Sequence, residues 1–404
     1  AALTRQHRED LATIMTAEQG KPYEESLGEI NYGANFLEWF AAEAERSYGE
    51  SIPSHLPGRQ LTTRLQPIGV TAAVTPWNFP SAMITRKAGA ALAAGCPMII
   101  KPASETPLSA LALAKLAEEA GFPAGVFQVV TGDAQKLSKR LLQRTEVRAF
   151  SFTGSTEVGR ILLRQSADTV KKVSLELGGH APFMVFEDAN VKEAAKDCIG
   201  AKFATSGQDC LAANRIYVHR TLYEAFITEF TELAKALRVG HGLEEGVDIG
   251  PMTRVSVANK CRDHIGNAVS MGARLMCGGL DNHLGSNFVL PTVLADVTDE
   301  MDISFEETFG PVAAILPFDT EEEVVRRANK SEYGLAAYVY TNDLKRAARV
   351  SEQLEYGMVA LNTPSFTGAP IPFGGWKQSG LGREGSKHGL AEYMELKYVC
   401  VGGL

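Results

Sequence analysis

The chain has 404 residues, of which 45% are hydrophobic and 22% charged, as is usual for globular proteins. A chain of this length is expected to form more than one domain. Its formal net charge of −8 disfavours nucleic acid or an anionic membrane surface as a partner, because both attract basic faces. No apolar run is long enough to span a bilayer, and the first residues lack the apolar core of a signal peptide.

Strand-like and helix-like segments alternate from about residue 68 onward. Short β-rich runs such as IGVTAAV end in proline or polar residues, whereas 109–121 has apolar residues at helical spacing and stops at Gly121. The segment 147–165 is expected to form a strand, a glycine turn and a helix. This alternation predicts βαβ units and a mostly parallel sheet with helices on both faces.

The alternation restarts after the pair Gly178 and Gly179, which predicts a second α/β domain from about residue 179. Two β-like segments lie outside this pattern. One is QLTTRLQPIG (60–69), which together with the neighbouring IPSHLPG (52–58) suggests an exposed hairpin, and the other is the tail 392–404. Neither has an evident partner strand. Both are therefore candidates for pairing across a subunit interface, although ordinary edge strands would look the same.

Six cysteines are scattered along the sequence. None forms a CxxC pair, and no histidine stands at metal-ligand spacing from any of them. A disulfide framework is not expected in a long chain with a large core. These features favour a cytoplasmic enzyme in a reducing compartment, with no metal site.

One cysteine, Cys210, lies in a polar, glycine-containing interruption, FATSGQDCLAANR (203–215), between apolar stretches. Taken alone it is better explained as a small buried hydrophobe than as a reactive thiol, because cysteine is among the residues most often buried. A reactive role requires partner groups elsewhere in the chain.

Two segments at expected strand ends suit a nucleotide. SFTGSTEVG (151–159) places small residues between a strand and a helix, where free N–H groups favour an anion. A plain turn capped by Ser155 or Thr156 would look the same. KPAS (101–104) lies at the sheet edge where α/β folds bind ligands, so Lys101 suits a ribose or phosphate, or is a solvated surface residue.

Two further segments carry groups that suit catalysis. In TPWNFP (75–80) two prolines hold Asn78 in a rigid segment, where its amide can donate to an oxyanion; a turn with Trp77 in the core is the alternative. Glu176 in LELGG becomes a useful general base if it is buried. An ion pair with Lys171 or Lys172 is the competing account.

EETFGP (306–311) places a carboxylate, Glu307, near an aromatic ring, Phe309. Such a pair suits a ribose and a nicotinamide ring. A loop glutamate beside a core phenylalanine is the alternative, and the motif taken alone favours it.

Together and in this order, the motifs resemble the aldehyde dehydrogenase family along the whole chain. The matching segments are EQGKP, TPWNFP, LAAGCPMIIKPAS, SFTGSTEVG, LELGG, GQDC, EETFGP, PFGGWKQSG and GREG. Within the family the sequence is most similar to succinate-semialdehyde dehydrogenases, through PSAMITRKAGAALAAGCPMIIKPAS, KKVSLELGG and REGSKHGLAEYMELKYVCVGGL. The resemblance implies an α/β fold with a Rossmann-type cofactor domain, an α/β catalytic domain and a small β oligomerisation arm.

The resemblance also implies domain limits. The cofactor domain would cover 1–50 and 67–178, the catalytic domain with its return segment 179–390, and the arm 51–66 with 391–404. Relatives begin with further strands of the cofactor domain, so we expect part of that domain to precede residue 1. A homodimer or homotetramer is expected on family grounds.

In the implied mechanism, Cys210 attacks the aldehyde carbon, and Asn78 with the backbone N–H of Cys210 holds the oxyanion. Hydride transfer from this thiohemiacetal to a nicotinamide leaves a thioester, and Glu176 activates the water that hydrolyses it to the carboxylic acid. Hydrolysis is expected rather than transfer to coenzyme A, because acyl-transferring relatives have little need for this base.

The resemblance further implies which residues line the cofactor site. They are Thr75, Trp77, Lys101, Ser104, Gly154, Ser155, Leu177, Glu307 and Phe309. NAD-preferring relatives often carry glutamate at position 104, which binds the adenine ribose and repels a 2′-phosphate. Ser104 removes that repulsion and Lys101 adds a positive charge. We therefore expect NADP or NAD as cofactor, with NADP accepted.

Succinate-semialdehyde dehydrogenases hold the far carboxylate of the substrate with two arginines and a serine. The first arginine matches Arg86, but the second falls on Ala204. The serine falls on Gly368, and Ser365 or Thr367 could replace it if the loop path differs. Losing one bidentate arginine costs about 2–4 kcal/mol of transition-state binding. Succinate semialdehyde is the expected substrate, with another semialdehyde or a less charged aldehyde as the alternative.

Two functions of other classes compete with this one. A non-catalytic binding protein of the same fold is disfavoured by the joint presence of Cys210, Glu176 and Asn78. A cysteine hydrolase would use Cys210 with a histidine, and the best-placed one in the sequence, His180, has no evident third group to orient it.

Overall fold

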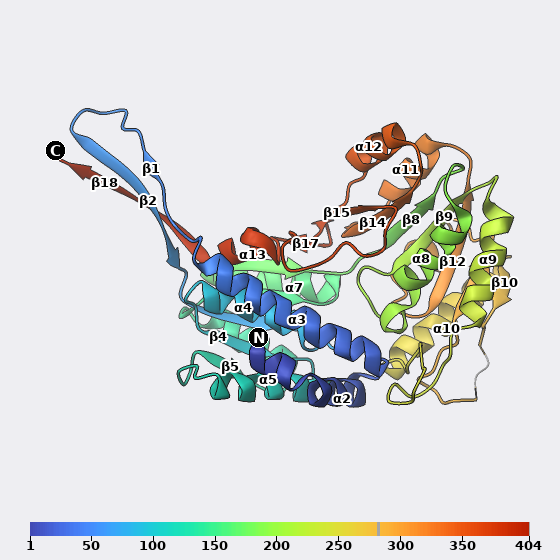
Figure 1. Cartoon of the computed structure of the whole chain (residues 1–404), viewed down its shortest axis with the longest axis horizontal. Helices are drawn as coiled ribbons and strands as arrows, with labels where there is room; N and C mark the ends of the chain where they lie inside the picture. Colours follow the sequence, from blue (N-terminus) through green and yellow to red (C-terminus); the bar gives the residue numbers. More distant parts are fainter. Residues whose placement is uncertain (281–282, 404) are drawn as a thin grey trace.

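The computed structural model describes residues 1–280 and 283–403 of the chain. Two α/β bodies lie side by side, and a narrow β arm extends from the first of them (Figure 1). Among the described residues, no helix combines the length and the apolar composition needed to cross a membrane.

The first body is built on a six-stranded sheet in the order β17-β7-β6-β3-β4-β5. Its strands are β3 (Val70–Val74), β4 (Met98–Lys101), β5 (Phe127–Val129), β6 (Val147–Thr153), β7 (Lys172–Glu176) and β17 (Gly380–Leu381). Only β17 runs antiparallel to its neighbour in this sheet. The chain moves from β3 to one side through β4 and β5, then returns to the other side of β3 with β6. Such a reversal is where open α/β sheets bind ligands, at the carboxyl ends of the strands.

Both faces of this sheet are buried, as the continuous apolar strands predict. Alternate residues of β3 point to opposite sides: Ala73 joins the core formed with Phe36 and Ile84, whereas Ala72 joins the core formed with Leu162. The helices of this body are α1 (Ala2–Gln6), α2 (Arg8–Gln19), α3 (Tyr23–Ala44), α4 (Ala82–Ala93), α5 (Pro107–Glu119), α6 (Ala134–Gln143), α7 (Thr156–Ser166), α13 (Ser386–Ala391) and the short η1 (Ala167–Thr169).

The second body is built on a seven-stranded sheet in the order β10-β11-β12-β9-β8-β14-β15, parallel except for β10. Its strands are β8 (Ala181–Val185), β9 (Ala213–His219), β10 (Arg274–Cys277), β11 (Thr292–Ala295), β12 (Val312–Phe318), β14 (Ala336–Tyr340) and β15 (Met358–Leu361). Its helices are α8 (Val191–Phe203), η2 (Ala204–Gly207), α9 (Tyr223–Lys235), α10 (Val255–Ser270), η3 (Asp302–Ser304), α11 (Glu321–Asn329) and α12 (Leu344–Gln353). Phe183 and Met184 point into the two separate cores on its two faces.

A return segment connects the second body to the first. The short strand β13 (Tyr333–Gly334) pairs with β16 (Trp376–Lys377), and the next strand, β17, then pairs with β7. In that pairing Gly380 lies opposite Glu176. The carboxyl end of β7, where the sequence predicts a general base, is therefore covered by chain from the distant C-terminal region.

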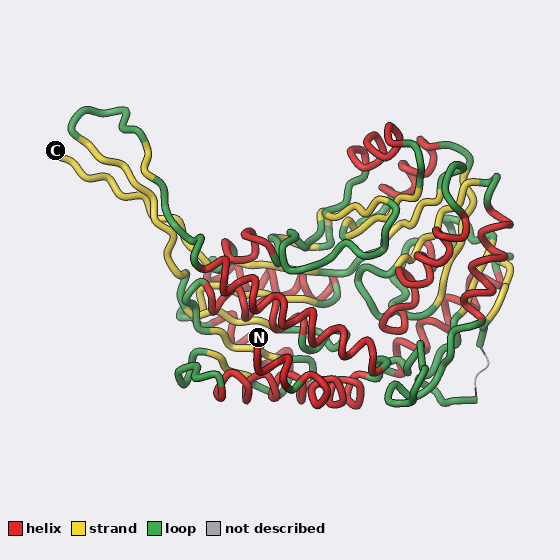
Figure 2. Tube along the Cα trace, in the orientation of Figure 1, coloured by secondary structure: helices red, strands yellow, loops and turns green. Residues whose placement is uncertain are grey.

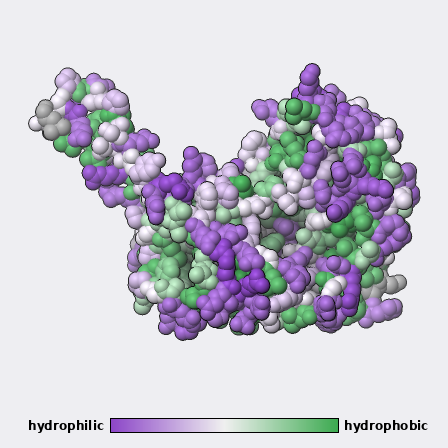
Figure 3. Space-filling view, viewed as in Figure 1, coloured by the Kyte–Doolittle hydropathy of each residue, from purple (hydrophilic) through white to green (hydrophobic). Residues whose placement is uncertain are grey.

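The arm consists of β1 (Ser51–Ile52), β2 (Arg59–Pro67) and β18 (Met394–Gly402), with a loop at its tip (Figure 2). β2 and β18 are antiparallel, from Met394 opposite Pro67 to Gly402 opposite Arg59. The two β segments that lacked an evident partner in the sequence are thus partners of each other. The arm still exposes apolar side chains, with Leu396 67% and Tyr398 57% exposed, and Figure 3 shows apolar patches on it.

Candidate active site

Three cavities follow one another, and two of them meet at Cys210. The central cavity, of about 600 Å³, includes Cys210 in its wall. A smaller cavity of about 280 Å³ shares Cys210 with it and contains Arg86; we call it the Arg86 cavity. The outer cavity, of about 570 Å³, shares Trp77, Gly154 and Ser155 with the central one. Among the described residues Cys210 alone lines both the central and the Arg86 cavity.

The predicted cofactor residues all lie in these cavities. The outer cavity contains Thr75, Trp77, Lys101, Ser104, Gly154 and Ser155. The central cavity contains Trp77, Gly154, Ser155, Leu177, Glu307 and Phe309, together with Asn78, Glu176 and Cys210. Thr75 and Trp77 follow β3 and Gly154 and Ser155 follow β6, so they stand at the reversal of strand order.

The segment that leads to Cys210 is strained and held in place. Thr205 (φ 52°), Ser206 (φ 57°) and Gly207 (φ 72°) are consecutive residues in the left-handed region, which is costly for residues other than glycine. The backbone N–H of Thr205 donates to both carboxylate oxygens of Glu25, at 2.9 and 3.0 Å. This contact with α3 supports an unfavourable backbone path that delivers Cys210 to the cavities.

Cys210 is nearly buried, with 7% of its surface exposed. Burial raises the pKa of its thiol well above the ordinary value, and the neighbouring carboxylates of Glu176 and Asp209 raise it further. The thiol is therefore protonated at neutral pH, and its reaction requires a group that accepts the proton.

Glu176 ends β7 and is 3% exposed. Neither of its carboxylate oxygens has a hydrogen-bond partner among the described residues. Burial raises its pKa to about 7, against the opposing influence of Arg86. The Nζ atoms of Lys171 and Lys172 bind backbone carbonyls instead, so the alternative of an ion pair with either lysine is wrong.

Asn78 follows β3 and is buried with its Nδ2 donating to the carbonyl of Gln208 at 3.1 Å. That bond uses one of the two amide hydrogens and fixes the side chain beside the Cys210 segment. In the described part of the chain the backbone N–H of Cys210 has no acceptor. These two donors fit an oxyanion formed at the thiol.

The outer cavity has the groups that a nucleotide needs. Lys101 is buried rather than solvated, and its Nζ reaches the Ser104 hydroxyl at 3.4 Å. The Thr75 hydroxyl is buried without a partner among the described residues. Ser155 caps the N-terminus of the eleven-residue α7, where free N–H groups favour an anion, so the capped-turn explanation and the nucleotide explanation hold together. The residues present fit a dinucleotide.

Glu307 and Phe309 line the central cavity. Glu307 accepts a hydrogen bond from the Gly179 N–H at 3.1 Å, and burial raises its pKa to about 8. Phe309 packs edge-on against Trp77, with ring centroids 5.5 Å apart. A Cβ at Gly179 would lie 2.3 Å from the Cys210 carbonyl oxygen, so this position requires glycine.

The predicted substrate residues are only partly brought together. Arg86 and Thr367 line the Arg86 cavity, whereas Ser365 is exposed and outside the lining of all three cavities. Ala204 is exposed and lines a separate cavity that also touches Glu25. Arg86 is buried, pairs with Glu384 at 2.6 Å and lies 3.8 Å over the ring of Phe373.

The Arg86 cavity is also lined by three residues that were not predicted from the sequence, namely Glu25, Tyr32 and Asp209. A role for Asp209 could have been predicted from the sequence, because it is a charged residue that directly precedes the candidate nucleophile. Glu25 and Tyr32 lie on one face of α3 at helical spacing, far from Cys210 in the sequence, and no motif there indicated a role.

His180 does not serve Cys210. It lines neither cavity at the thiol, and its Nε2 lies 3.0 Å from the carbonyl oxygen of Glu306. Burial lowers its pKa well below the ordinary value. The geometry thus disfavours a cysteine hydrolase. No group of three His, Cys, Asp or Glu in the described residues is arranged to hold a metal ion.

The fold and the cavities define an α/β enzyme with a buried cysteine between two adjoining cavities that fit a dinucleotide and a smaller cavity that contains Arg86. The sequence model described as "Aldehyde dehydrogenase family" matches residues 1–399. The chain belongs to the aldehyde dehydrogenase family, whose members are oxidoreductases, and the resemblance and the fold expected from it are confirmed.

Named relatives match almost the entire chain. An aspartate-semialdehyde dehydrogenase (non-phosphorylating) from Halomonas elongata is 56% identical over 100% of this chain and 82% of its own length. A 3-sulfolactaldehyde dehydrogenase from Pseudomonas putida is 54% identical, with 100% and 83% covered. An NADP(+) succinate-semialdehyde dehydrogenase from Escherichia coli is 53% identical, with 99% and 83% covered.

Solved structures of aldehyde dehydrogenases have the same fold as this chain. An NADP-dependent enzyme from E. coli superposes with a TM-score of 0.98 at 53% identity, over 99% of this chain and 83% of that one. An NAD+ complex of an aldehyde dehydrogenase from Bacillus cereus gives 0.97 at 39% identity, over 100% and 82%.

Proposed function

We propose that this chain oxidises a semialdehyde, an aldehyde with an anionic group at its far end, to a carboxylic acid, with NADP or NAD as the hydride acceptor. The observation that carries this proposal is the place of Cys210, between the cavity that fits a dinucleotide and the cavity that contains Arg86. The relatives act on aldehydes that bear a carboxylate or a sulfonate. Succinate semialdehyde is the first substrate to test.

The first step is nucleophilic addition. Glu176, with a pKa of about 7, accepts the proton of the Cys210 thiol. The sulfur attacks the carbonyl carbon, a C–S bond forms, and the electron pair of the C=O bond moves to oxygen. The amide of Asn78 and the backbone N–H of Cys210 then donate to this oxyanion.

The second step releases the acid. When bound in the central cavity, the nicotinamide supplies a hydride acceptor for the substrate carbon. Glu176 releases the thiol proton to solvent before hydrolysis. The resulting thioester on Cys210 is then attacked by water, and the ionised Glu176 accepts a proton from that water. The C–S bond breaks, and the sulfur recovers a proton as the carboxylic acid leaves.

The cofactor residues favour acceptance of NADP. Lys101 and Ser104 lie together in the outer cavity and present a cation and a hydroxyl rather than a carboxylate. A 2′-phosphate is stabilised by such a pair and repelled by glutamate.

The same proposal includes a homodimer or homotetramer that associates through the arm, and a cytoplasmic location. It also includes a division of the chain into a cofactor domain (1–50 with 67–178), a catalytic domain (179–390) and the arm (51–66 with 391–404). The apolar side chains exposed on the arm, including Leu396 and Tyr398, support association through it.

The test is formation of reduced cofactor when the protein meets succinate semialdehyde, other C4 to C6 semialdehydes and neutral aldehydes with each cofactor. We expect reduction with at least one semialdehyde, and about a 10³-fold or greater loss in Cys210→Ser. Cys277→Ser, outside the three cavities, is the matched control. No reduced cofactor with any aldehyde, or full activity in Cys210→Ser, would contradict the proposal.

A further inference from the structure

The Arg86 cavity contains two carboxylates without a cationic partner. Asp209 directly precedes Cys210, is half-buried and accepts a hydrogen bond on Oδ1 from the Leu211 N–H at 2.9 Å. Glu25 lines the same cavity and accepts only the Thr205 N–H. No lysine, arginine or histidine in the described residues forms an ion pair with either.

The lysine that acts on this pair is already engaged. Lys21 is fully buried; its Nζ binds Glu29 at 2.6 Å and lies 4.1 Å from the ring centroid of Phe79. One cation and one carboxylate balance each other there. Lys21 therefore forms no ion pair with Glu25 or Asp209.

Arg86 gives the same cavity a positive group. Glu384 is shared between Arg86 and Lys87, so two cations have one carboxylate and a positive charge is left over. Arg86 is 2% exposed, and its Nε has no hydrogen-bond acceptor among the described residues. A buried guanidinium with an unused donor, lining a cavity, indicates an anionic ligand.

We propose that Asp209 and Glu25 select a semialdehyde that carries an ammonium group between its carbonyl carbon and its carboxylate, an amino-acid semialdehyde. This inference rests on the proposed function and names the substrate class of that same site. Asp209, next to the nucleophile, binds the ammonium group, and Arg86 binds the carboxylate. A semialdehyde without the ammonium group brings an anion into a cavity with two carboxylates that form no ion pair among the described residues.

The ionisation of the two carboxylates agrees with this role. Burial raises the pKa of Asp209, and it raises that of Glu25 to about 7. The backbone N–H groups of Leu211 and Thr205 and the charge of Lys21 act in the opposite direction. A bound cation lowers the energy of both ionised forms. Hydrogen bonds from an ammonium to a carboxylate are among the stronger ones in proteins.

Two substrates that differ by a single group provide the test. 2-Amino-4-oxobutanoate and 4-oxobutanoate have the same carbon chain, aldehyde and carboxylate, and only the first has an ammonium group. We expect kcat/KM to be higher for the amino compound by about tenfold or more. The corresponding acids, as competitive inhibitors, should show the same preference without any turnover.

Asp209→Asn keeps the size and the acceptor for the Leu211 N–H but removes the charge. It should lower the ratio of kcat/KM for the amino compound to kcat/KM for 4-oxobutanoate by about tenfold or more, because any effect of the lost charge on the Cys210 thiol is common to both substrates. Asp263→Asn, an exposed residue outside the cavities, is the matched control and should change neither value.

The outcomes separate this proposal from the function on which it rests. If the wild-type protein oxidises neither compound nor any aldehyde of the panel, the proposed function fails. If it oxidises 4-oxobutanoate as well as the amino compound, the function stands and the ammonium site is refuted. Equal losses for both substrates in Asp209→Asn would show a structural role and also refute it. If that variant does not fold, the wild-type ratio and the inhibition by the two acids decide.

Discussion

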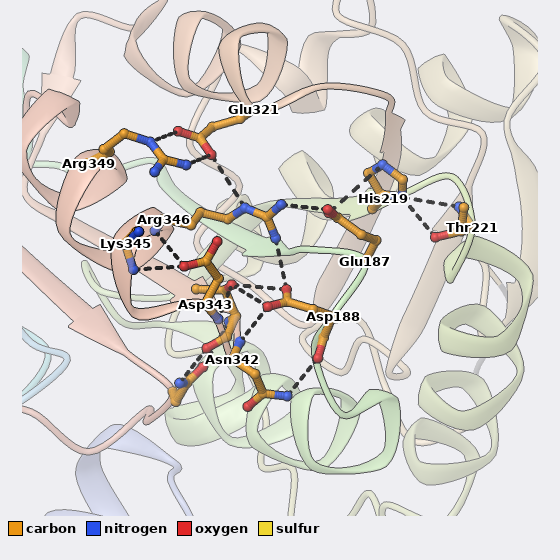
Figure 4. Close-up of polar contacts among 12 residues, drawn as sticks. Glu187, Asp188, His219, Thr221, Glu321, Asn342, Asp343, Lys345, Arg346 and Arg349 are labelled. Atoms are coloured by element: carbon orange, nitrogen blue, oxygen red, sulfur yellow. Dashed lines mark hydrogen bonds and ion pairs between the residues drawn. The ribbon is translucent and has the colours of Figure 1, made fainter.

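The carboxylates around Arg346 form ion pairs with arginines, whereas several carboxylates around Cys210 are buried or half-buried without an ion-pair partner among the described residues. Arg346 donates to Glu187 at 2.5 Å, to Asp188 at 2.9 Å and to Glu321 at 3.3 Å (Figure 4). Its guanidinium also lies 4.7 Å from the ring centroid of Phe186. We call these residues the Arg346 cluster. Every carboxylate in it faces a cation.

The pKa of Glu321 in the Arg346 cluster moves in the opposite direction to the pKa values of the carboxylates at the candidate active site. The Arg349 guanidinium lowers the pKa of Glu321 in the Arg346 cluster. At the candidate active site, burial raises the pKa of Glu25 and Glu176 to about 7 and of Glu307 to about 8. Paired carboxylates stabilise the fold at neutral pH, whereas the unpaired ones are kept ready to bind a proton or a cation, at a cost in stability.

The largest effect is expected from Glu176→Gln, which keeps the shape and cannot accept a proton. Steady-state turnover should fall by about 10²- to 10⁴-fold. Because a buried charge disappears, the free energy of unfolding at pH 8 should rise by about 2 kcal/mol. Steady-state kinetics and urea unfolding measure the two. Glu352→Gln changes an exposed residue away from the cavities and should change neither turnover nor the free energy of unfolding. If Glu176→Gln keeps more than a tenth of wild-type turnover, Glu176 is not the base in the mechanism.

The dependence of kcat on pH should report the ionisation of Glu176. A base with a pKa of about 7 is ionised above that pH and protonated below it, so kcat should fall about tenfold for each pH unit below 7. A kcat that stays constant down to pH 5 would mean that an ordinary glutamate, with its pKa near 4.3, limits the reaction.

The candidate catalytic residues that lie within short motifs could be predicted from the sequence. Asn78, Glu176 and Cys210 each lie in a segment whose local chemistry is readable, and the strands that end at them have clear apolar patterns. Contacts between distant segments could not be predicted. Thr205 and Glu25 are 180 residues apart, and nothing in the sequence of α3 shows that its first turn supports the nucleophile segment. For the same reason β2 and β18 were found as strands without their pairing.

A smaller effect is expected from Ser104→Glu, which brings a carboxylate into the outer cavity beside Lys101. Repulsion of the 2′-phosphate should lower kcat/KM for NADP by about tenfold or more, while NAD is retained through a bond to its ribose. The ratio of kcat/KM for the two cofactors is the measurement. An unchanged ratio would show that the phosphate binds elsewhere.

The smallest effect on activity, and the clearest contrast, is expected from Arg346→Ala. It should lower the free energy of unfolding by about 1–2 kcal/mol, through lost ion pairs and lost packing on Phe186, and leave kcat/KM unchanged. Arg220→Ala removes an exposed ion pair with Asp319 and should have no measurable effect on unfolding.

The pH dependence of that loss has a definite sign. The folded pKa of Glu321 is lowered, so the stability it contributes is present above its unfolded pKa and is lost as the pH falls through the folded value. Arg346→Ala should therefore cost most at neutral pH and least near pH 3. Unfolding curves at several pH values measure this. An equal cost at every pH would mean that Arg346 acts through packing on Phe186 alone, and the contrast with the carboxylates around Cys210 would then rest on burial rather than on pairing.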